Sequence, residues 1–585
     1  MRNLRMISDV LSAESSRHQK KEELLSANQD LRYTDIVSAS FGNVQVSWNE
    51  GKVDRAFEYL HRLVDQRKAI YGVTTSFGGN VHHVIPREDA ESLQENLIVS
   101  HACNVGEFAP YHLSKAALLL RTLTLAKGYS GVSPGTLRMQ RQLLEHDVIP
   151  AIRLHGSLGA SGDIGPLATI ALTMIGKGYA WGPNGAGVKS TKERLDECGL
   201  EPIKLTYKEG LALLNGTSMM TSVGCFYLQM ARRLIENSLV VGAMSVEALR
   251  ASKHPYDARL HALKPHRFSV NTARVMESIL RESRLARSHR ELKESVEEEA
   301  RGKDEAFFAK TDIQGGSYSL RAIPQIYHPI LAMFQGYEEA INTEINSVDD
   351  NPLLLPESDE QLHGAHFHGY PIAVAADCLN LALVGLSNVP LSRIDRLLKS
   401  HHSYLPWFLA TGTEGLHLGM HGLQFTAAGI GNELRNLSLP NSVEQIPTNN
   451  DNQDVVSFGL QAALKGLEIV SLLAYVVAIE YMCAGQGIWL NLRGKSDVGP
   501  VAETDLSPVT RAAYAQLQEV YRPEVGKDQN MVDQVESLAR RLLMDSLLPD
   551  SESELLWGQP AGVEVYESNA GFKAVTFITA LGVAK

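Results

Sequence analysis

The chain has 585 residues, of which 44% are hydrophobic, and a formal net charge of −12 at pH 7. This composition supplies a large buried core, and the acidic balance argues against a nucleic-acid partner, because duplex binders concentrate Lys and Arg on their surface. The five cysteines are widely spaced and form no CxxC pair, so neither a disulfide framework nor a structural zinc site is indicated.

Helical periodicity dominates along the chain. Ser114 is expected to cap a helix with the apolar sequence KAALLLRTLTLAKG. Longer helices are predicted over about 226–252, 372–398 and 455–485, where Ala and Leu prevail over the alternation that is typical of strands. Turn residues cluster at 181–185, which favours a short hairpin there.

These elements predict a mainly α protein, with a long central helical bundle and a smaller, mixed, loop-rich N-terminal domain. We expect three consecutive regions: 1–205, 206–500 and 501–585. The last region should be helical with a tail, in which residues 572–578 form a strand.

No segment of the sequence predicts a membrane span or a secretion signal. The N-terminus lacks the apolar core of a signal peptide. The longest apolar run lies between Glu468 and Glu480, which is short of the roughly 20 residues that cross a bilayer. We therefore expect a buried core helix at this position, and a cytoplasmic protein without a membrane partner.

The segment Gly159-Ala160-Ser161-Gly162-Asp163 allows two interpretations. The ordinary one is a tight turn, since glycine tolerates backbone angles that other residues do not. The chemical one is cyclisation, in which the Gly162 nitrogen attacks the Ala160 carbonyl and one water is lost. Loss of a second water from Ser161 leaves an exocyclic methylene, and the product is a methylidene-imidazolone (MIO), an electrophile built into the chain.

Further motifs support the chemical interpretation. Together with this segment they resemble, in chain order, the MIO family of histidine, phenylalanine and tyrosine ammonia-lyases and the related 2,3-aminomutases. The motifs are YGVTT at 71–75, GSLGASGD at 156–163, KEGLALLNGT at 208–217, YSLRAIPQ at 318–325, DNPL at 350–353 and DNQDVVS at 451–457. The resemblance implies an MIO group formed autocatalytically from Ala160-Ser161-Gly162 without an external cofactor. It also implies a homotetramer with shared active sites and a small amino acid as substrate.

The chemistry of amine elimination explains why such an enzyme needs these residue types. A weakly acidic β-proton must be removed and a poor leaving group expelled, and capture of the amine in a covalent MIO adduct improves the leaving group. The resemblance assigns the base to Tyr71, with Tyr318 assisting from a loop that can close over the site. It places Asn215 against the MIO carbonyl, where a hydrogen bond polarises the ring.

Three residues are candidates for holding the substrate. Arg321 suits a carboxylate, because a guanidinium group can donate two parallel hydrogen bonds to it. Asn351 resembles a second contact near that carboxylate, although Asp-Asn-Pro is also typical of turns. Phe367 is expected to pack against the ring of the substrate.

The residues expected to contact the aromatic ring of the substrate do not decide which amino acid binds. Ser100 and His101 match the positions at which members of the family contact the side chain of the substrate. His101 can form a hydrogen bond with a phenol or an imidazole. Histidine lyases place a glutamate where this chain has Gln453, which argues against histidine. Tyrosine aminomutases have a glutamate at the position of Gly79 and a tyrosine at that of Phe425, so this pocket is less polar. We predict L-phenylalanine or L-tyrosine, with histidine and urocanate as the alternative.

The sequence does not separate a lyase, which releases cinnamate or coumarate, from an aminomutase, which returns ammonia to the β-carbon. That outcome depends on how long a lid keeps the intermediate enclosed. A hypothesis from a different class is a catalytically inactive helical assembly protein, which would need a broken site, whereas every catalytic residue named above is present.

Three histidines, His363, His366 and His368, have a spacing that is compatible with zinc. No cysteine or carboxylate nearby completes a ligand set, and the resemblance implies no catalytic metal. We therefore predict that no metal binds here.

Overall fold

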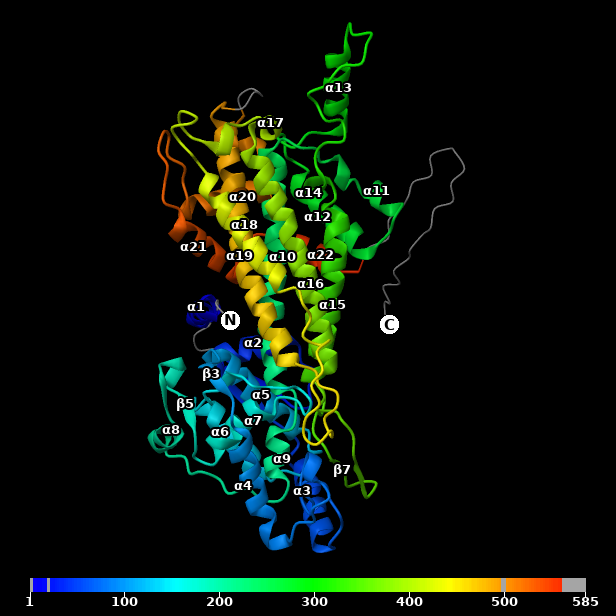
Figure 1. Ribbon diagram of the computed structural model, residues 1–585, viewed down its shortest axis with the longest axis vertical. Helices are drawn as coiled ribbons and strands as arrows, with labels where there is room; N and C mark the ends of the chain where they lie inside the picture. Colours follow the sequence, from blue (N-terminus) through cyan, green and yellow to red (C-terminus); the bar gives the residue numbers. More distant parts are fainter. Residues whose placement is uncertain (1–3, 18–21, 496–500, 560–585) are drawn as a thin grey trace, which may run out of the picture. The chain divides into compact units, whose positions relative to one another are not determined.

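The computed structural model describes residues 4–17, 22–495 and 501–559, which fold into two compact units (Figure 1). Unit 1 comprises Met1–Gln229, Gln335–Leu381 and Leu439–Glu468. Unit 2 comprises Met230–Phe334, Ala382–Ser438 and Ile469–Lys585. The predicted mainly α fold is confirmed, whereas the division into three consecutive regions differs from these two units. The strand expected at 572–578 lies outside the described residues.

Unit 1 combines short helices with pairs of strands, as expected for the mixed N-terminal part. Its helices are α1 (Leu4–Arg17), α2 (Tyr33–Phe41), α3 (Glu50–Asp65), α4 (Ala90–His101), α5 (Tyr111–Ala126), α6 (Pro134–Glu145), α7 (Ile164–Met174), α8 (Thr191–Cys198) and α9 (Glu209–Leu214). Strands β1 (Glu22–Ser26) and β2 (Asn43–Ser47) pair in parallel. Three further pairs are antiparallel: β3 (Val105–Phe108) with β4 (Arg153–His155), β5 (Tyr179–Trp181) with β6 (Val188–Ser190), and β7 (Leu353–Leu355) with β8 (Glu360–Leu362). The pair β5–β6 is the hairpin expected around residues 181–185.

Four long helices explain why the unit boundaries were not predicted. They are α10 (Ser218–Ala248), α15 (Ile323–Ile345), α16 (Tyr370–Leu398) and α19 (Gly459–Leu492). Each of them contributes residues to both units. A boundary inside a regular helix leaves no linker composition in the sequence, so it cannot be recognised from local patterns.

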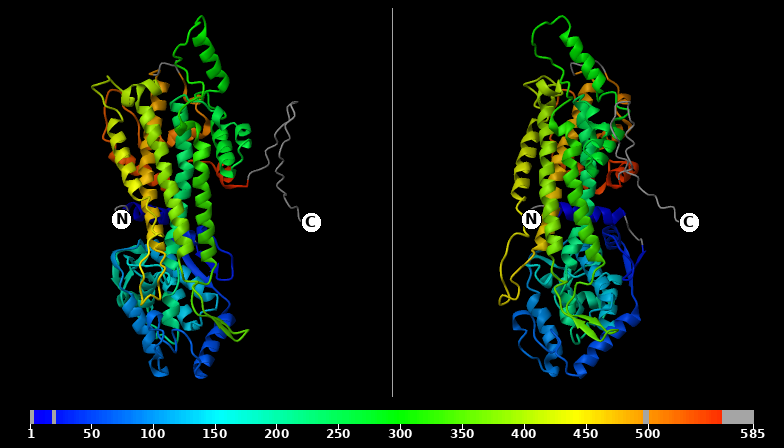
Figure 2. Two further views of the ribbon diagram at one scale, coloured as in Figure 1. Left: turned by 45° about the vertical axis from the view of Figure 1, so that its right-hand side comes forward. Right: turned by 90° about the vertical axis from the view of Figure 1, so that its right-hand side faces the viewer.

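Unit 2 is built from helices. In it, segments of α10, α15, α16 and α19 lie side by side (Figures 1 and 2). The further helices are α11 (Ala258–Ala262), α12 (Arg267–Leu280), α13 (His289–Ala300), α14 (Tyr318–Arg321), α17 (Ser400–Ser403), α18 (His421–Asn436), α20 (Pro508–Val520), α21 (Val532–Met544) and α22 (Asp550–Trp557).

Helix α5 is buried along its whole length, because most of its side chains are apolar on every face. The helix begins at Tyr111 behind Pro110, so the prediction that Ser114 caps it is wrong. Pro110 is the N-cap, and its carbonyl accepts from the Leu113 and Ser114 N–H groups at 3.0 and 3.2 Å, so Ser114 already lies inside the first turn. The two cations of the helix are paired: Lys115 donates to the Gly42 carbonyl at 2.8 Å, and Arg121 forms an ion pair with Asp349 at 2.8 Å.

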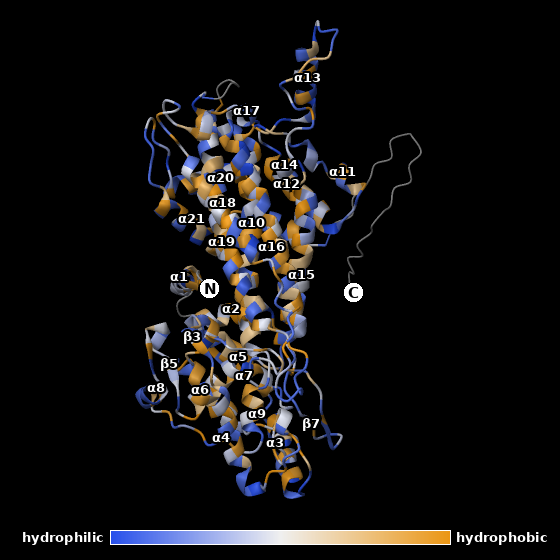
Figure 3. Cartoon of the chain, in the orientation of Figure 1, coloured by the Kyte–Doolittle hydropathy of each residue, from blue (hydrophilic) through white to orange (hydrophobic). Residues whose placement is uncertain are grey.

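Helices α16 and α19 are long and apolar enough to span a membrane by length and composition alone. Apolar residues recur along both helices (Figure 3). In α19, however, 83% of the most apolar stretch is buried inside the protein, and in α16 the share is 61%. This burial agrees with the core helix predicted between Glu468 and Glu480.

Candidate active site

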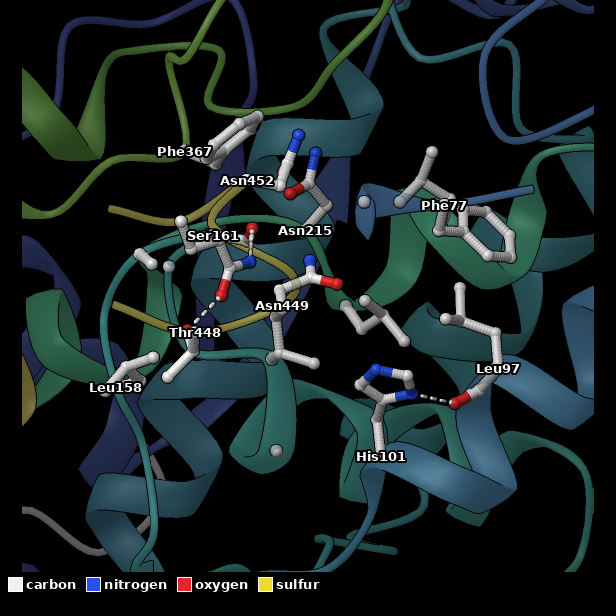
Figure 4. Close-up of a pocket in the computed structure, with 18 of the residues that line it drawn as sticks. Phe77, Leu97, His101, Leu158, Ser161, Asn215, Phe367, Thr448, Asn449 and Asn452 are labelled. Carbon is white, nitrogen blue, oxygen red and sulfur yellow. Dashed lines mark hydrogen bonds between the residues drawn. The ribbon is translucent and has the colours of Figure 1, made fainter. Parts of the chain in front are cut away.

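A cavity of about 830 Å³ in unit 1 brings most of the predicted site residues together. Its volume lies in the range that suits a small-molecule ligand. Figure 4 shows Ser161 and Thr448 on one side of this cavity and His101, Leu97 and Phe77 on the other. The predicted residues that line it are Tyr71, Ser100, His101, Ala160, Ser161, Gly162, Asn215, Phe367 and Gln453.

The backbone around Ser161 is bent sharply and packed against a second glycine-containing turn. Gly162 has a φ of +71°, and a β-carbon there would lie 2.0 Å from the Gly216 carbonyl oxygen. The Asp163 N–H donates to that same oxygen at 2.7 Å. Only glycine therefore fits at position 162. The segment from Ala160 to Gly162 is therefore a tight turn of small residues.

Asp163 is the N-cap residue that immediately precedes helix α7, and it is fully buried. Its carboxyl accepts hydrogen bonds from the Met220 N–H at 2.7 Å and from the Ser157 hydroxyl at 3.0 Å. Burial raises the pKa of Asp163 to about 7, although these donors oppose the shift. The buried carboxyl is therefore neutral over much of the acidic pH range.

The raised pKa of Asp163 predicts a pH-dependent stability. In the unfolded chain this carboxyl titrates near its ordinary pKa of about 3.9, so between about pH 4 and about pH 7 only the folded chain holds the proton. Its contribution to stability is present at low pH and is lost as the pH rises through about 7. The free energy of unfolding of the wild type, relative to Asp163→Asn, should fall by on the order of 4 kcal/mol across this window.

Urea titrations at several pH values measure this difference. The matched control is Asp54→Asn, which changes a solvent-exposed carboxylate of α3. The difference in the free energy of unfolding between Asp54→Asn and the wild type should change little over the same pH range. A flat difference for Asp163→Asn would contradict the assignment of a neutral buried carboxyl.

Gln453 contacts the central serine directly. Its side-chain N–H donates to Ser161 Oγ at 2.9 Å, and its carbonyl oxygen accepts from the Thr448 hydroxyl at 3.1 Å. The backbones of Thr448 and Gln453 are also paired, with N···O distances of 3.0 and 3.2 Å. In this arrangement the uncharged amide of Gln453 bridges the two hydroxyls and directs its N–H at Ser161.

Asn215 follows helix α9 and is held by a buried ion pair. Its side-chain N–H donates to Asp350 Oδ1 at 3.1 Å, while Asp350 Oδ2 pairs with the Lys208 ammonium. The side chains of Lys208 and Asp350 are both fully buried, and burial lowers the pKa of Lys208. Removing one partner of such a pair leaves an uncompensated buried charge, so the pair is a rigid support for Asn215.

The hydroxyl of Tyr71 is held by the backbone. It accepts a hydrogen bond from the Gly78 N–H at 3.0 Å. The ring meets Phe77 and His363 edge to face, with centroid distances of 6.5 and 6.4 Å. An amide N–H directed at a phenol oxygen stabilises negative charge on that oxygen, which suits a tyrosine that takes a proton.

His101 is the last residue of α4, and its tautomer follows from its contacts. Nδ1 lies 2.8 Å from the Leu97 carbonyl oxygen and 3.0 Å from Ser100 Oγ. A carbonyl oxygen only accepts, so Nδ1 carries the hydrogen, and Nε2 of the neutral ring is left as an acceptor. The ring is directed into the cavity (Figure 4), where Nε2 can accept a hydrogen bond from a ligand.

Comparison with known proteins identifies the family. The model of the family described as aromatic amino acid lyase matches residues 31–519. The chain belongs to the aromatic amino acid lyase family. It is 37% identical over 488 residues to a histidine ammonia-lyase of Symbiobacterium thermophilum, covering 83% of this chain and 90% of that protein. It is 36% identical over 493 residues to an MIO-dependent tyrosine 2,3-aminomutase of Streptomyces globisporus, covering 84% and 89%.

Among solved structures, the phenylalanine aminomutase of Pantoea agglomerans aligns with a TM-score of 0.82 and 33% identity, over 90% of this chain and 99% of that chain. The chain is thus an enzyme, an ammonia-lyase or an aminomutase for an aromatic amino acid, and the hypothesis of an inactive assembly protein is set aside. The names of these relatives give three different amino acids, histidine, tyrosine and phenylalanine. Family membership therefore does not decide which aromatic side chain the substrate of this enzyme carries.

Three predicted site residues of this lyase-family enzyme lie in unit 2, and none of them lines the cavity of unit 1. Tyr318 and Arg321 belong to helix α14, and Tyr318 is 70% exposed. The Arg321 guanidinium lies 4.7 Å from the centroid of the Tyr318 ring. Phe425 is on α18 and is 65% exposed.

Two other predicted residues support the cavity without lining it. The Asn351 side-chain oxygen accepts from the Gly364 N–H at 2.8 Å, which ties it to the segment that leads to Phe367. The Gly79 N–H donates to the Asn449 side chain at 2.9 Å. Asn449 does line the cavity, so an amide lies beside Gly79, the position where the sequence indicated only a loss of polarity.

Sequence reasoning missed several residues at this site. Their positions gave a partial signal, because Lys208 and Asp350 begin two of the family motifs and Asn452 lies within a third. Their contacts join residues more than 100 positions apart, which local patterns do not reveal. Missed residues that line the cavity include Phe77, Leu97, Thr448, Asn449 and Asn452.

The three histidines considered for zinc have different surroundings. His363 lies against the ring of Tyr71, and His368 lies 3.1 Å from the Val455 carbonyl through Nε2. His366 lines a separate cavity of about 430 Å³ with Glu344. Within the described ranges, no three His, Cys, Asp or Glu side chains are grouped so that they could hold a metal ion.

Proposed function

We propose that this enzyme removes or moves the amine of L-phenylalanine or L-tyrosine with an MIO group made from Ala160, Ser161 and Gly162. The observation that carries the proposal is that Ser161, Tyr71, Asn215 and His101 line one cavity. The steric fit of Gly162 against Gly216 supports ring formation at this turn. An MIO group in this position supplies an electrophile for the substrate amine.

The residues of the cavity then have separate tasks. The deprotonated oxygen of Tyr71 takes the β-proton and becomes a neutral phenol, and the Gly78 N–H stabilises the negative charge that this oxygen carries before the transfer. Asn215, held by Asp350, lines the same cavity as Ser161 and would hydrogen-bond the carbonyl of the MIO group. Phe367 offers an apolar face to the substrate ring.

The side of the cavity around His101 favours an uncharged aromatic ring. Leu97 and Phe77 supply apolar surface, and His101 Nε2 can accept the hydrogen of a phenol. Gln453 is uncharged and its N–H is directed at Ser161, so it offers no carboxylate to an imidazole. These contacts support phenylalanine or tyrosine over histidine.

We infer that the active site is completed by a second copy of the chain in a homotetramer. Tyr318, Arg321 and Phe425 do not line the cavity, and Tyr318 and Phe425 are largely exposed. Long helices also expose apolar side chains, among them Leu381 at 55% and Met333 at 37%, as an interface would require. Arg321 from another copy would bind the substrate carboxylate.

A cytoplasmic location fits the five cysteines, which are all free thiols.

Incubation with phenylalanine, tyrosine and histidine in separate reactions tests the proposed substrate. The expected products are cinnamate or coumarate for a lyase and the β-amino acid for an aminomutase, all of which chromatography separates. Urocanate as the main product would overturn the substrate proposal. Intact-mass measurement of the same sample should find two waters missing from the sequence mass, and a full mass would overturn the MIO proposal.

A further inference from the structure

Helix α14 carries Tyr318 and Arg321 but cannot be stable by itself. It has four residues, and the preceding residues 301–317 form neither helix nor strand, while at its other end Ala322 alone separates it from α15. Isolated helices shorter than about 12 residues are only marginally stable in water. The free energy lost by ordering the backbone of the first turn exceeds the free energy gained from its hydrogen bonds. Besides its attachment to α15, the position of α14 must therefore be set by the part of unit 2 on which it rests.

Arg393 of α16 provides one of these supports. Its side chain is completely buried, and Nη1 donates to the Ser319 carbonyl of α14 at 3.1 Å. Its other donors bind Glu480 of α19 through two parallel hydrogen bonds of 2.6 and 2.8 Å. The Ser245 hydroxyl donates to the same carboxylate at 2.6 Å. A guanidinium held in this bidentate way has a fixed plane, so its remaining donor has a fixed direction.

The backbone of α10 also restrains the guanidinium. A β-carbon at Gly242 would lie 3.3 Å from three guanidinium atoms of Arg393, closer than ordinary van der Waals contact. The glycine therefore lets the planar group pack directly against the helix. Helices α10, α16 and α19 thus jointly determine where this donor points.

Tyr256 provides a second, independent support. Its side chain is completely buried, and its hydroxyl donates to the Leu320 carbonyl at 2.8 Å. Ser319 and Leu320 are the two central residues of α14. Two consecutive carbonyls of the helix are therefore held by donors from the core, while Tyr318 on the same helix is 70% exposed.

We propose that Arg393 and Tyr256 are positioning residues that fix α14, and with it the reactive groups of Tyr318 and Arg321. This inference rests on the proposed function, in which those two side chains act on the substrate. A displacement of about 1 Å in a reacting group can reduce the rate about 100-fold, so loss of either support should lower turnover without removing any group from the site.

The first test compares Tyr256→Phe with Tyr481→Phe. The control tyrosine is also buried in unit 2, but its hydroxyl donates to the Ala513 carbonyl. Both variants lose one buried hydroxyl and should have similar melting temperatures. Only Tyr256→Phe is expected to lower kcat, by about 10-fold, and to speed hydrogen exchange of the α14 amides. Equal losses in both variants, or unchanged kcat and exchange in Tyr256→Phe, would overturn the proposal.

The second test separates the contact to α14 from the charge of the buried pair. Replacing Arg393 alone by methionine would leave Glu480 unpaired and risk misfolding, so both residues are changed together in Arg393→Met/Glu480→Leu. We expect a folded protein with a kcat about 100-fold lower. Arg393→Lys, which keeps a donor without the planar fork, should recover part of this loss. A folded double variant with wild-type kcat and KM would contradict the proposal.

Intact mass distinguishes failure of this inference from failure of the proposed function. All variants should lose two waters, because the Ala160–Gly162 turn lies in unit 1 and none of these substitutions touches it. If the wild type itself shows full mass or no turnover, the proposed function is wrong. If the wild type is active and the α14 variants match it, only the positioning role is wrong.

Discussion

Ser161→Ala is expected to reduce turnover of the aromatic amino acid by on the order of 10³-fold or more, equivalent to about 4 kcal/mol of transition-state stabilisation. Alanine has no β-leaving group, so the exocyclic methylene cannot form even if the backbone cyclises. Intact-mass measurement should therefore show at most one water missing instead of two. The packing of the turn against Gly216 should persist, because that contact is made by the backbone of Gly162.

The matched control is Ser130→Ala. Ser130 is also buried in unit 1, and among the described residues its hydroxyl has no hydrogen-bond partner. It does not line the cavity. This variant should lose two waters and keep wild-type turnover. A Ser161→Ala chain that still lacks two waters, or that turns over substrate normally, would show that the electrophile is made elsewhere.

Tyr71→Phe is expected to have the second largest effect, a reduction of kcat by about 10²- to 10⁴-fold, the usual contribution of a positioned acid or base. The ring of phenylalanine can keep the edge-to-face contacts with Phe77 and His363, so the cavity should keep its shape. The Gly78 N–H loses its acceptor, and no other atom of the side chain can take the β-proton. Intact mass should still show the loss of two waters.

Tyr59→Phe is the control, since Tyr59 belongs to a hydrophobic cluster of unit 1 and does not line the cavity.

Mixing Tyr71→Phe with Tyr318→Phe chains, followed by dissociation and reassembly, tests whether sites are shared. Some mixed sites would then contain Tyr71 from one chain and Tyr318 from another, and activity should return. A mixture that stays as inactive as each variant alone would indicate that both tyrosines come from one chain.

The fold could be predicted where the signal is local. The core helix between Glu468 and Glu480 lies within α19, because an apolar run without helix breakers specifies a buried helix. The cap predicted at Ser114 was wrong, because a tertiary environment that buries all of α5 lets the helix begin earlier, at Tyr111. The two units were not predicted, since their boundaries fall inside α10, α15, α16 and α19.

In the candidate site, too, local features could be predicted from the sequence, whereas contacts between distant residues could not. The amino-acid sequence by itself predicts the reactive turn, because the proposed cyclisation of Ala160-Ser161-Gly162 involves three consecutive residues, and it determined the family through motifs of fixed order. Only the tertiary structure decided that Gln453 binds Ser161 across 292 positions and that Lys208 supports Asn215 through Asp350. It also decided that Arg393 holds α14. Covalent chemistry depends on neighbours in the chain, whereas the orientation of each side chain depends on hydrogen bonds that form only when distant segments pack together.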